Sequence, residues 1–124
     1  MIVDNMETRK KILSLTENHL FKKTYSKGKC RVCEYAAIYV LKNYRRNETR
    51  IGITASKSRG NAVVRSRIRR VLRECVRPIY PEIKKGYLVV IVARQGVEKQ
   101  KTTVVGPKIR EMLIDLGLYE GAKK

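Results

Sequence analysis

The stretch from Arg50 to Arg77 constrains this chain more than any other, because its hydrophobic period changes from that of a strand to that of a helix. Apolar and polar residues alternate between Arg50 and Ser56, as is typical of a β-strand, and the alternation breaks at Gly60. The next apolar residues have the spacing of one helix face: Val64, Ile68, Val71, Leu72 and Cys75. Glycine permits a sharp turn and asparagine is a good N-cap, so the sequence predicts a helix that begins after Asn61.

The opposite side of this predicted helix is almost entirely basic. It carries Arg65, Arg67, Arg69, Arg70, Arg73 and Arg77, and only Glu74 lies among them as an acidic neighbour. Arginine does not deprotonate, and its planar fork matches two phosphate oxygens at once. A solvated amphipathic helix would be the simpler interpretation of a face with mixed charges. This face instead favours binding to a nucleic-acid backbone.

The composition of the whole chain agrees with a polyanionic partner. The formal net charge is +18 over 124 residues, which attracts RNA, DNA or an anionic surface without further specificity. The longest apolar run, Tyr87–Ala93, is too short to span a membrane, and the N-terminal residues lack the pattern of a secretion signal. We therefore expect a single cytoplasmic domain that does not bind a membrane.

The three cysteines predict reduced thiols and no disulfide framework. Cys30 and Cys33 form a C-x-x-C pattern, which is found in zinc sites and in redox pairs. No second pair completes a zinc site, since His19 is the only histidine, so a coincidence in a loop before a strand is the preferred interpretation. Cys75 lies on the apolar stripe and is expected in the core. We predict no metal site and no catalytic residue in the chain.

A short helix is expected near the N-terminus. Ser14 and Glu17 have the spacing of a capping box, and Lys27-Gly28 is a plausible end, so the helix should contain residues 19–26. Phe21 and Tyr25 are four residues apart and share one helix face, where spacing alone favours an ordinary core role.

The remaining periodic segments complete the predicted sheet and its cover. Cys33–Leu41 reads as a strand whose core face carries Ala36, Ile38 and Val40, and the polar turn Asn43–Thr49 predicts an antiparallel hairpin with the strand after it. Tyr87–Ala93 is continuously apolar, as expected for an interior strand. Pro107 is predicted at the first turn of a last helix that packs and ends at Gly117.

The order of these elements predicts an α+β fold, a single-domain α/β sandwich with helices packed on a sheet. The domain is expected to span residues 14–119, between a flexible basic tail at 1–13 and a disordered tail at 120–124. General statistics favour a right-handed crossover around the arginine-rich helix.

The same central stretch resembles a known family. Ser56-Lys57, Gly60-Asn61-Ala62-Val63-Val64-Arg65 and then Arg65-Ser66-Arg67-Ile68-Arg69-Arg70 resemble the motif of the bacterial-type ribonuclease P protein. The chain departs from the family pattern at Ser66, where an asparagine is usual, and at Ser58-Arg59. The resemblance covers residues 15–117 and also includes Arg94, which matches a basic position after a strand.

The resemblance implies a four-stranded, mainly antiparallel sheet with a left-handed βαβ crossover, similar to the ribosomal protein S5 domain 2-like fold. We adopt that hand, together with a further short strand beside the hairpin. The resemblance also implies two RNA-binding sites. The basic helix and the residues before it would bind RNA through Lys57, Asn61, Arg65, Ser66, Arg67, Arg69, Arg70 and Arg73. A cleft bordered by Phe21, Tyr25 and Tyr39 would hold the 5′ leader of precursor tRNA.

The function implied by this resemblance is that of the protein subunit of ribonuclease P, which assists the endonucleolytic removal of the 5′ leader from precursor tRNA. Its partners would be the catalytic RNA subunit and precursor tRNA, with Mg²⁺ held mainly by the RNA. A structural or assembly RNA-binding protein of ribosomal type is the alternative, because it explains the charge equally well. A DNA-binding helix is disfavoured, since the continuous basic face leaves few side chains to read bases.

Overall fold

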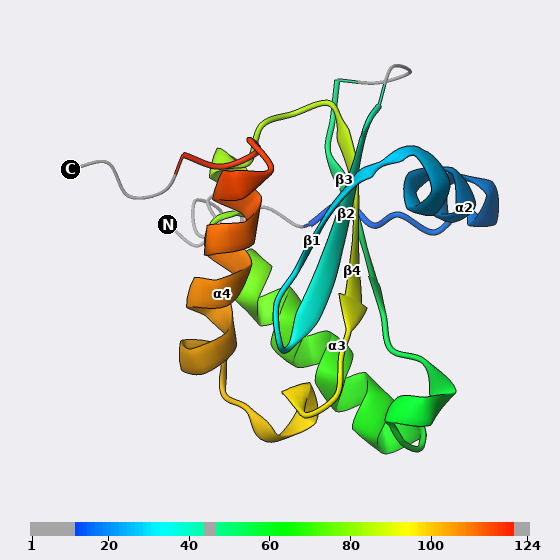
Figure 1. The fold of residues 1–124 in the computed structure, drawn as a ribbon, viewed down its shortest axis with the longest axis vertical. Coiled ribbons are helices and arrows are strands. Elements are labelled where there is room, and N and C mark those ends of the chain that lie inside the picture. The colour runs from blue at the N-terminus through cyan, green and yellow to red at the C-terminus, as the bar shows by residue number, and fades with distance from the viewer. Residues whose placement is uncertain (1–11, 44–46, 121–124) are drawn as a thin grey trace, which may run out of the picture.

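A computed structural model describes residues 12–43 and 47–120 of the chain. The helices are α2 (Asn18–Lys27), α3 (Ala62–Val76) and α4 (Thr102–Asp115), and the strands are β1 (Lys29–Val32), β2 (Ala36–Lys42), β3 (Arg50–Thr54) and β4 (Tyr87–Ala93). Short 3-10 helices lie at η1 (Lys57–Arg59), η2 (Tyr80–Glu82) and η3 (Val97–Lys99). Figure 1 shows the sheet nearly edge-on, with α2 on one side and α4 on the other. The predicted α+β sandwich is confirmed.

The sheet has the strand order β1-β2-β4-β3. Strand β2 is antiparallel to both β1 and β4, whereas β3 and β4 are parallel. The predicted hairpin between Cys33–Leu41 and the strand that begins at Arg50 is therefore wrong, because β4 lies between β2 and β3. Strand β4 is apolar along its whole length, and such a strand is buried most fully in the interior of a sheet. It therefore lies between β2 and β3, although the short polar turn that joins those two strands suggested that they pair directly. The predicted short extra strand is β1, at the edge beside β2.

Helix α3 forms as the sequence predicts. The side chain of Asn61 accepts a hydrogen bond from the Val64 amide at 3.0 Å, which caps the first turn. Ile68, Leu72 and Cys75 are buried, and Val76 extends the buried stripe beyond the predicted arc. The parallel connection from β3 through α3 to β4 is the crossover, and its hand stays a prediction from the resemblance.

Two details of the helix ends differ from the predictions. Ser14 does not cap α2. It forms a parallel bridge with Ile51, and α2 begins at Asn18 after Glu17, which makes no side-chain capping bond. Helix α4 begins at Thr102, so Pro107 lies inside the helix and not in its first turn. Both predictions failed because local capping signals compete with tertiary contacts that only the folded chain provides.

The core lies mainly on one side of the sheet. Helices α3 and α4 pack there on Ile38, Val89 and Ile91. The other side carries a smaller cluster of Leu88 and Val90 with Leu15, against which Phe21 and Tyr39 pack. Alternate residues of β4 are thus buried on both faces, which confirms that it is an interior strand.

The described chain joins the sheet from Leu13 onward, because the Leu13 carbonyl accepts a hydrogen bond from the Ile51 amide at 2.8 Å. Residues 1–11 of the predicted N-terminal tail and residues 121–124 of the C-terminal one lie outside the described residues. Within the described ranges, no helix is long and apolar enough to cross a membrane.

Candidate nucleic-acid interface

The exposed side of α3 is a surface of guanidinium groups. Arg67, Arg70 and Arg73 are exposed, whereas Arg65 and Arg69 are half-buried where this side meets the apolar stripe. The half-buried position of Arg65 has a visible cause: its Nε donates to the Gly60 carbonyl oxygen at 3.2 Å, which ties it to the turn before the helix. The side chains of α3 thus divide between packing and charge as the sequence predicts, with Arg65 and Arg69 at the border.

These arginines lack neighbouring carboxylates. Glu74, the only acid in α3, pairs with Arg77 at 3.1 Å, at the C-terminal end of the helix. The other ion pairs among residues 12–43 and 47–120 join Arg31 to Asp115, Arg50 to Glu48 and Lys108 to Glu34. No carboxylate in the described chain therefore pairs with the arginines from Arg65 to Arg73. Their mutual repulsion is relieved when an external polyanion binds.

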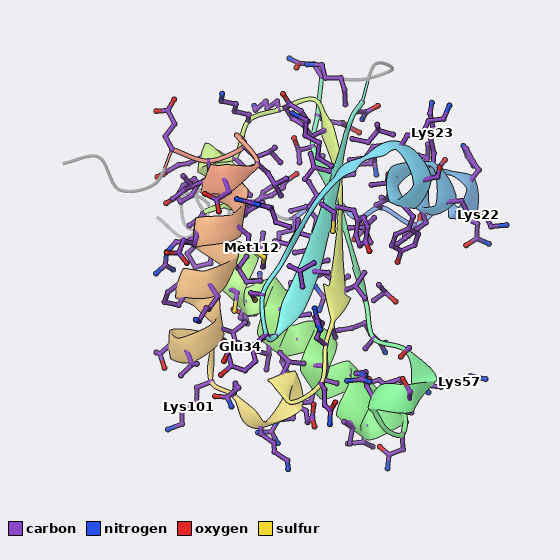
Figure 2. All side chains as sticks on the ribbon, viewed as in Figure 1. Lys22, Lys23, Glu34, Lys57, Lys101 and Met112 are labelled. Atoms are coloured by element: carbon purple, nitrogen blue, oxygen red, sulfur yellow. The ribbon has the colours of Figure 1, made fainter. Side chains whose placement is uncertain are left out.

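The residues that precede α3 extend this basic surface. Lys57 is exposed in η1, and Figure 2 shows its side chain pointing away from the protein. Ser66 is exposed within the helix. The side-chain oxygen of Asn61 already accepts the capping hydrogen bond from the Val64 amide, so an RNA contact by Asn61 would use another of its atoms. Lys22 and Lys23 point outward from α2 in the same figure and are exposed.

The predicted aromatic site lies on the other side of the sheet, where α2 crosses the strands. The Phe21 and Tyr25 ring centroids are 6.4 Å apart, and those of Tyr25 and Tyr39 are 5.0 Å apart at an interplanar angle of 87°. Phe21 and Tyr39 are half-buried, whereas Tyr25 is 40% exposed. The fold thus brings together all three rings from two distant segments, with Tyr25 the most accessible.

Both tyrosines of this cluster are uncharged near neutral pH. Burial and then the neighbouring Tyr39 raise the pKa of Tyr25. The Cys30 thiol raises the pKa of Tyr39, first through its charge when ionised and then through a hydrogen bond, and burial adds to this. An uncharged phenol does not repel phosphate, and the raised pKa values of both tyrosines extend this state to higher pH.

A strip of the sheet lies on the same face as the three rings, and we call the strip and the rings together the cleft, after the predicted site. The pairing registers place Val32, Ala37, Val92 and Thr54 opposite one another in a single row across the four strands. Val32 is 54% exposed, and Val92 and Thr54 are half-buried. Cross-strand partners share a face of the sheet, and so do residues two apart along a strand. Because Ala37 and Tyr39 are two residues apart in β2, the row lies on the same side as Tyr39. The cleft therefore has a floor of three apolar residues and Thr54, bordered by the aromatic rings.

A separate polar hollow lies at the end of the sheet where β3 leads into η1. It lies beyond the ends of β3 and β4 and is lined by Glu34, Ser56, Arg59, Ala93, Arg94 and Gln95. Arg59 and Arg94 have no ion pair among the described residues, and the Ser56 and Ser58 hydroxyls are 2.7 Å apart. Figure 1 shows η1 and the first turns of α3 projecting past this end of the sheet. The hollow therefore offers two guanidinium groups beside two hydroxyls, which suits an anionic ligand.

Sequence reasoning missed the residues of the cleft floor and Arg59. Val32, Val92 and Thr54 come from three strands, and only the pairing register shows that they form one row. Arg59 could have been found from its position directly before the Gly60-Asn61 turn.

The cysteine pattern does not build a metal site. The described residues contain no group of three or more histidine, cysteine, aspartate or glutamate side chains that could hold a metal ion. Cys30 pairs across from Tyr39 on the cleft side, whereas Cys33 packs against the main core and accepts a hydrogen bond from the Tyr35 amide at 3.4 Å. The two thiols thus belong to different sides of the sheet.

Comparison with known proteins gives a consistent result. The family model described as Ribonuclease P matches residues 10–117. The ribonuclease P protein component of Symbiobacterium thermophilum is 33% identical, with 90% of this chain and 96% of that protein covered. That of Clostridium beijerinckii is 37% identical, with 87% and 91% covered. A solved structure of the Staphylococcus aureus RNase P protein is 26% identical and superposes with a TM-score of 0.74, with 86% of this chain and 96% of that one covered.

Proposed function

Because the chain belongs to the ribonuclease P protein family, the protein component of an RNA-processing endonuclease, we propose that it serves this enzyme through two separate RNA-binding surfaces. The arginine side of α3 binds the catalytic RNA subunit, and the cleft binds the 5′ leader of precursor tRNA. The observation that carries this proposal is the placement of an unpaired arginine surface and an uncharged aromatic cleft on opposite sides of one sheet.

The helix surface suits a folded RNA backbone. Each guanidinium that neutralises a phosphate releases a condensed counterion, so affinity is high and strongly salt-dependent. The helix is held by Ile68 and Leu72, which are fully buried, so the exposed arginines project from a rigid base. A rigid array of forks favours phosphates at fixed spacing, as on a structured RNA.

The cleft suits a short single strand whose sequence varies. Aromatic rings stack on any base, at about 1–3 kcal/mol per base, without selecting among bases. A row across four strands spans roughly 14 Å, and four-stranded RNA-binding sheets of this size stack about two or three bases. The cleft would thus distinguish precursor tRNA from mature tRNA by the presence of a leader and not by its sequence.

We further propose that Mg²⁺ is held by the RNA subunit. The described part of the chain offers no cluster of ligating side chains for it, so the protein residues contribute binding and positioning only. A cytoplasmic location, where precursor tRNA is found, is part of the same proposal. The ribosomal-type alternative is disfavoured, because the similar proteins are named as ribonuclease P components.

The test is cleavage of precursor tRNA by a bacterial ribonuclease P RNA at low Mg²⁺, with and without the chain. We expect the chain to stimulate cleavage, and Tyr25→Ala to lower the affinity for precursor tRNA about tenfold while mature tRNA binds as before. Tyr25→Phe keeps the ring and is the matched control, expected to behave like the natural chain. Absence of stimulation would contradict the subunit role, and equal losses for precursor and mature tRNA would contradict the leader-binding role.

A further inference from the structure

Gly52 lies directly beneath the ring of Phe21. It is buried in β3, where a Cβ atom added to it would stand 2.5 Å from Phe21 Cζ and 3.0 Å from Phe21 Cε1. Carbon atoms that are not bonded pack at about 3.5–4.0 Å, so the ring occupies the space of the missing side chain. The tip of the Phe21 ring therefore packs directly against the backbone of Gly52.

The backbone does not require glycine at this position. Gly52 is absent from the described glycines with positive φ, which are Gly60, Gly86, Gly96 and Gly117. It pairs in register with Val90 inside a regular parallel ladder. Glycine within a strand lowers stability unless something must approach the backbone closely. The fold provides two such approaches, the Phe21 ring as the nearer and the Leu15 carbonyl oxygen at 3.1 Å as the other.

The seat of Phe21 determines where the next turn of α2 lies. Tyr25 follows Phe21 by four residues on the same helix face, and its ring lies 5.0 Å from that of Tyr39. A side chain at position 52 would lift Phe21 and with it the sheet-facing side of α2. The aromatic wall of the cleft would then stand farther from its floor.

We propose that Gly52 is a positioning residue for leader binding: its missing side chain seats Phe21 and thereby sets the separation between α2 and the sheet. This inference rests on the proposed function of the cleft. Gly52 would not contact RNA itself, but it would determine the position of the aromatic rings that do.

The experiment compares Gly52→Ala in two backgrounds, the natural chain and Phe21→Leu. Leucine lacks the ring atoms at the tip of phenylalanine, so it leaves room for the alanine methyl group. We expect Gly52→Ala to lower the preference for precursor over mature tRNA about tenfold in the natural chain and about twofold or less in the Phe21→Leu background. The remaining loss reflects the Leu15 carbonyl oxygen, which the added Cβ would meet at 3.1 Å.

Two controls separate this inference from other effects. Gly106→Ala, a glycine substitution in α4 whose nearest new contact is Arg110 Nη1 at 3.5 Å, should leave the preference unchanged. Affinity for the RNA subunit should also stay unchanged in Gly52→Ala, because α3 lies on the other side of the sheet. Equal losses from Gly52→Ala in both backgrounds, or no loss in either, would overturn the inference.

Failure of the inference is distinguishable from failure of the proposed function. If Tyr25→Ala lowers the preference for precursor tRNA but Gly52→Ala does not, the cleft binds the leader and the positioning role is wrong. If neither substitution changes the preference, the leader-binding role is wrong and the inference falls with it. Thermal unfolding of all variants shows whether each chain is folded at the assay temperature.

Discussion

The two sides of the sheet offer RNA two different kinds of surface. On one side, α3 presents the arginines from Arg65 to Arg73, which have no carboxylate partner in the described chain, on a helix anchored by the buried Ile68 and Leu72. On the other, α2 and the strands present three aromatic rings and the row of Val32, Ala37, Val92 and Thr54, which contains no charged side chain. The first surface attracts phosphates over a distance set by the Debye length, and the second acts only in direct contact.

This difference separates affinity from discrimination. Charge alone binds any RNA, so the α3 surface cannot distinguish precursor from mature tRNA. Stacking in the cleft is worth little unless an unpaired strand is already nearby, which binding to the RNA subunit would provide. Under the proposed function the protein needs both surfaces, and the sheet separates them so that two RNAs could be bound at once.

The largest expected effect comes from removing charge on α3. The double substitution of Arg67→Ala with Arg70→Ala should weaken binding to the RNA subunit about 30-fold at 0.15 M salt, because two phosphate contacts are lost. The slope of log affinity against log salt should flatten by roughly two. Filter binding across a salt series measures both quantities. Lys84→Ala with Lys85→Ala removes two exposed charges elsewhere and should have a much smaller effect, and equal losses would show that net charge alone matters.

A second effect should appear only on the cleft side. Val32→Asp places a carboxylate on the exposed floor of the cleft, where repulsion of a leader phosphate at about 6 Å should weaken precursor tRNA binding about tenfold. Mature tRNA should bind as before. Val104→Asp, at a 40% exposed position on α4, adds the same charge on the other side of the sheet. If the two substitutions reduce precursor binding equally, the cleft does not hold the leader.

The same contrast explains which features could be predicted from the sequence. The α3 surface is local: period, N-cap and charge all lie within Asn61–Arg77, so the helix and its arginine side followed from spacing alone. The aromatic site is non-local, and the three rings were expected together only from the family resemblance. Their ring distances agree with that expectation.

The cleft floor could not be predicted, because the strand pairing was wrong. With β3 placed beside β2 in a hairpin, Thr54 and Val92 would not fall in one row with Val32. Strand β1 gave little signal of its own, since it has only four residues and all of them are exposed. The pairing register depends on which strands lie next to each other, and the packing of the whole core determines that order.

A smaller effect tests whether the polar hollow belongs to the cleft. Arg59→Ala should weaken precursor tRNA binding about fourfold at 0.15 M salt, the expected loss for one phosphate contact on a single strand. Mature tRNA and the RNA subunit should bind as before. Arg31→Ala is the control, because Arg31 is already paired with Asp115 at 3.2 Å. If Arg59→Ala instead weakens the RNA subunit, the hollow belongs to the α3 surface.

The smallest effect concerns the one acid on α3. Glu74→Gln removes the partner of Arg77, so that side chain is free to meet phosphate, and binding to the RNA subunit should strengthen about twofold. Stability should change by less than about 0.5 kcal/mol, since the two side chains of this pair are 41% and 46% exposed. The measurement is a salt-dependent affinity beside a thermal unfolding curve, with Glu111→Gln on α4 as the control for losing one acid. Weaker binding in Glu74→Gln would mean that the ion pair holds Arg77 in the position that RNA requires, and that the end of α3 is ordered by its own residues before any RNA arrives.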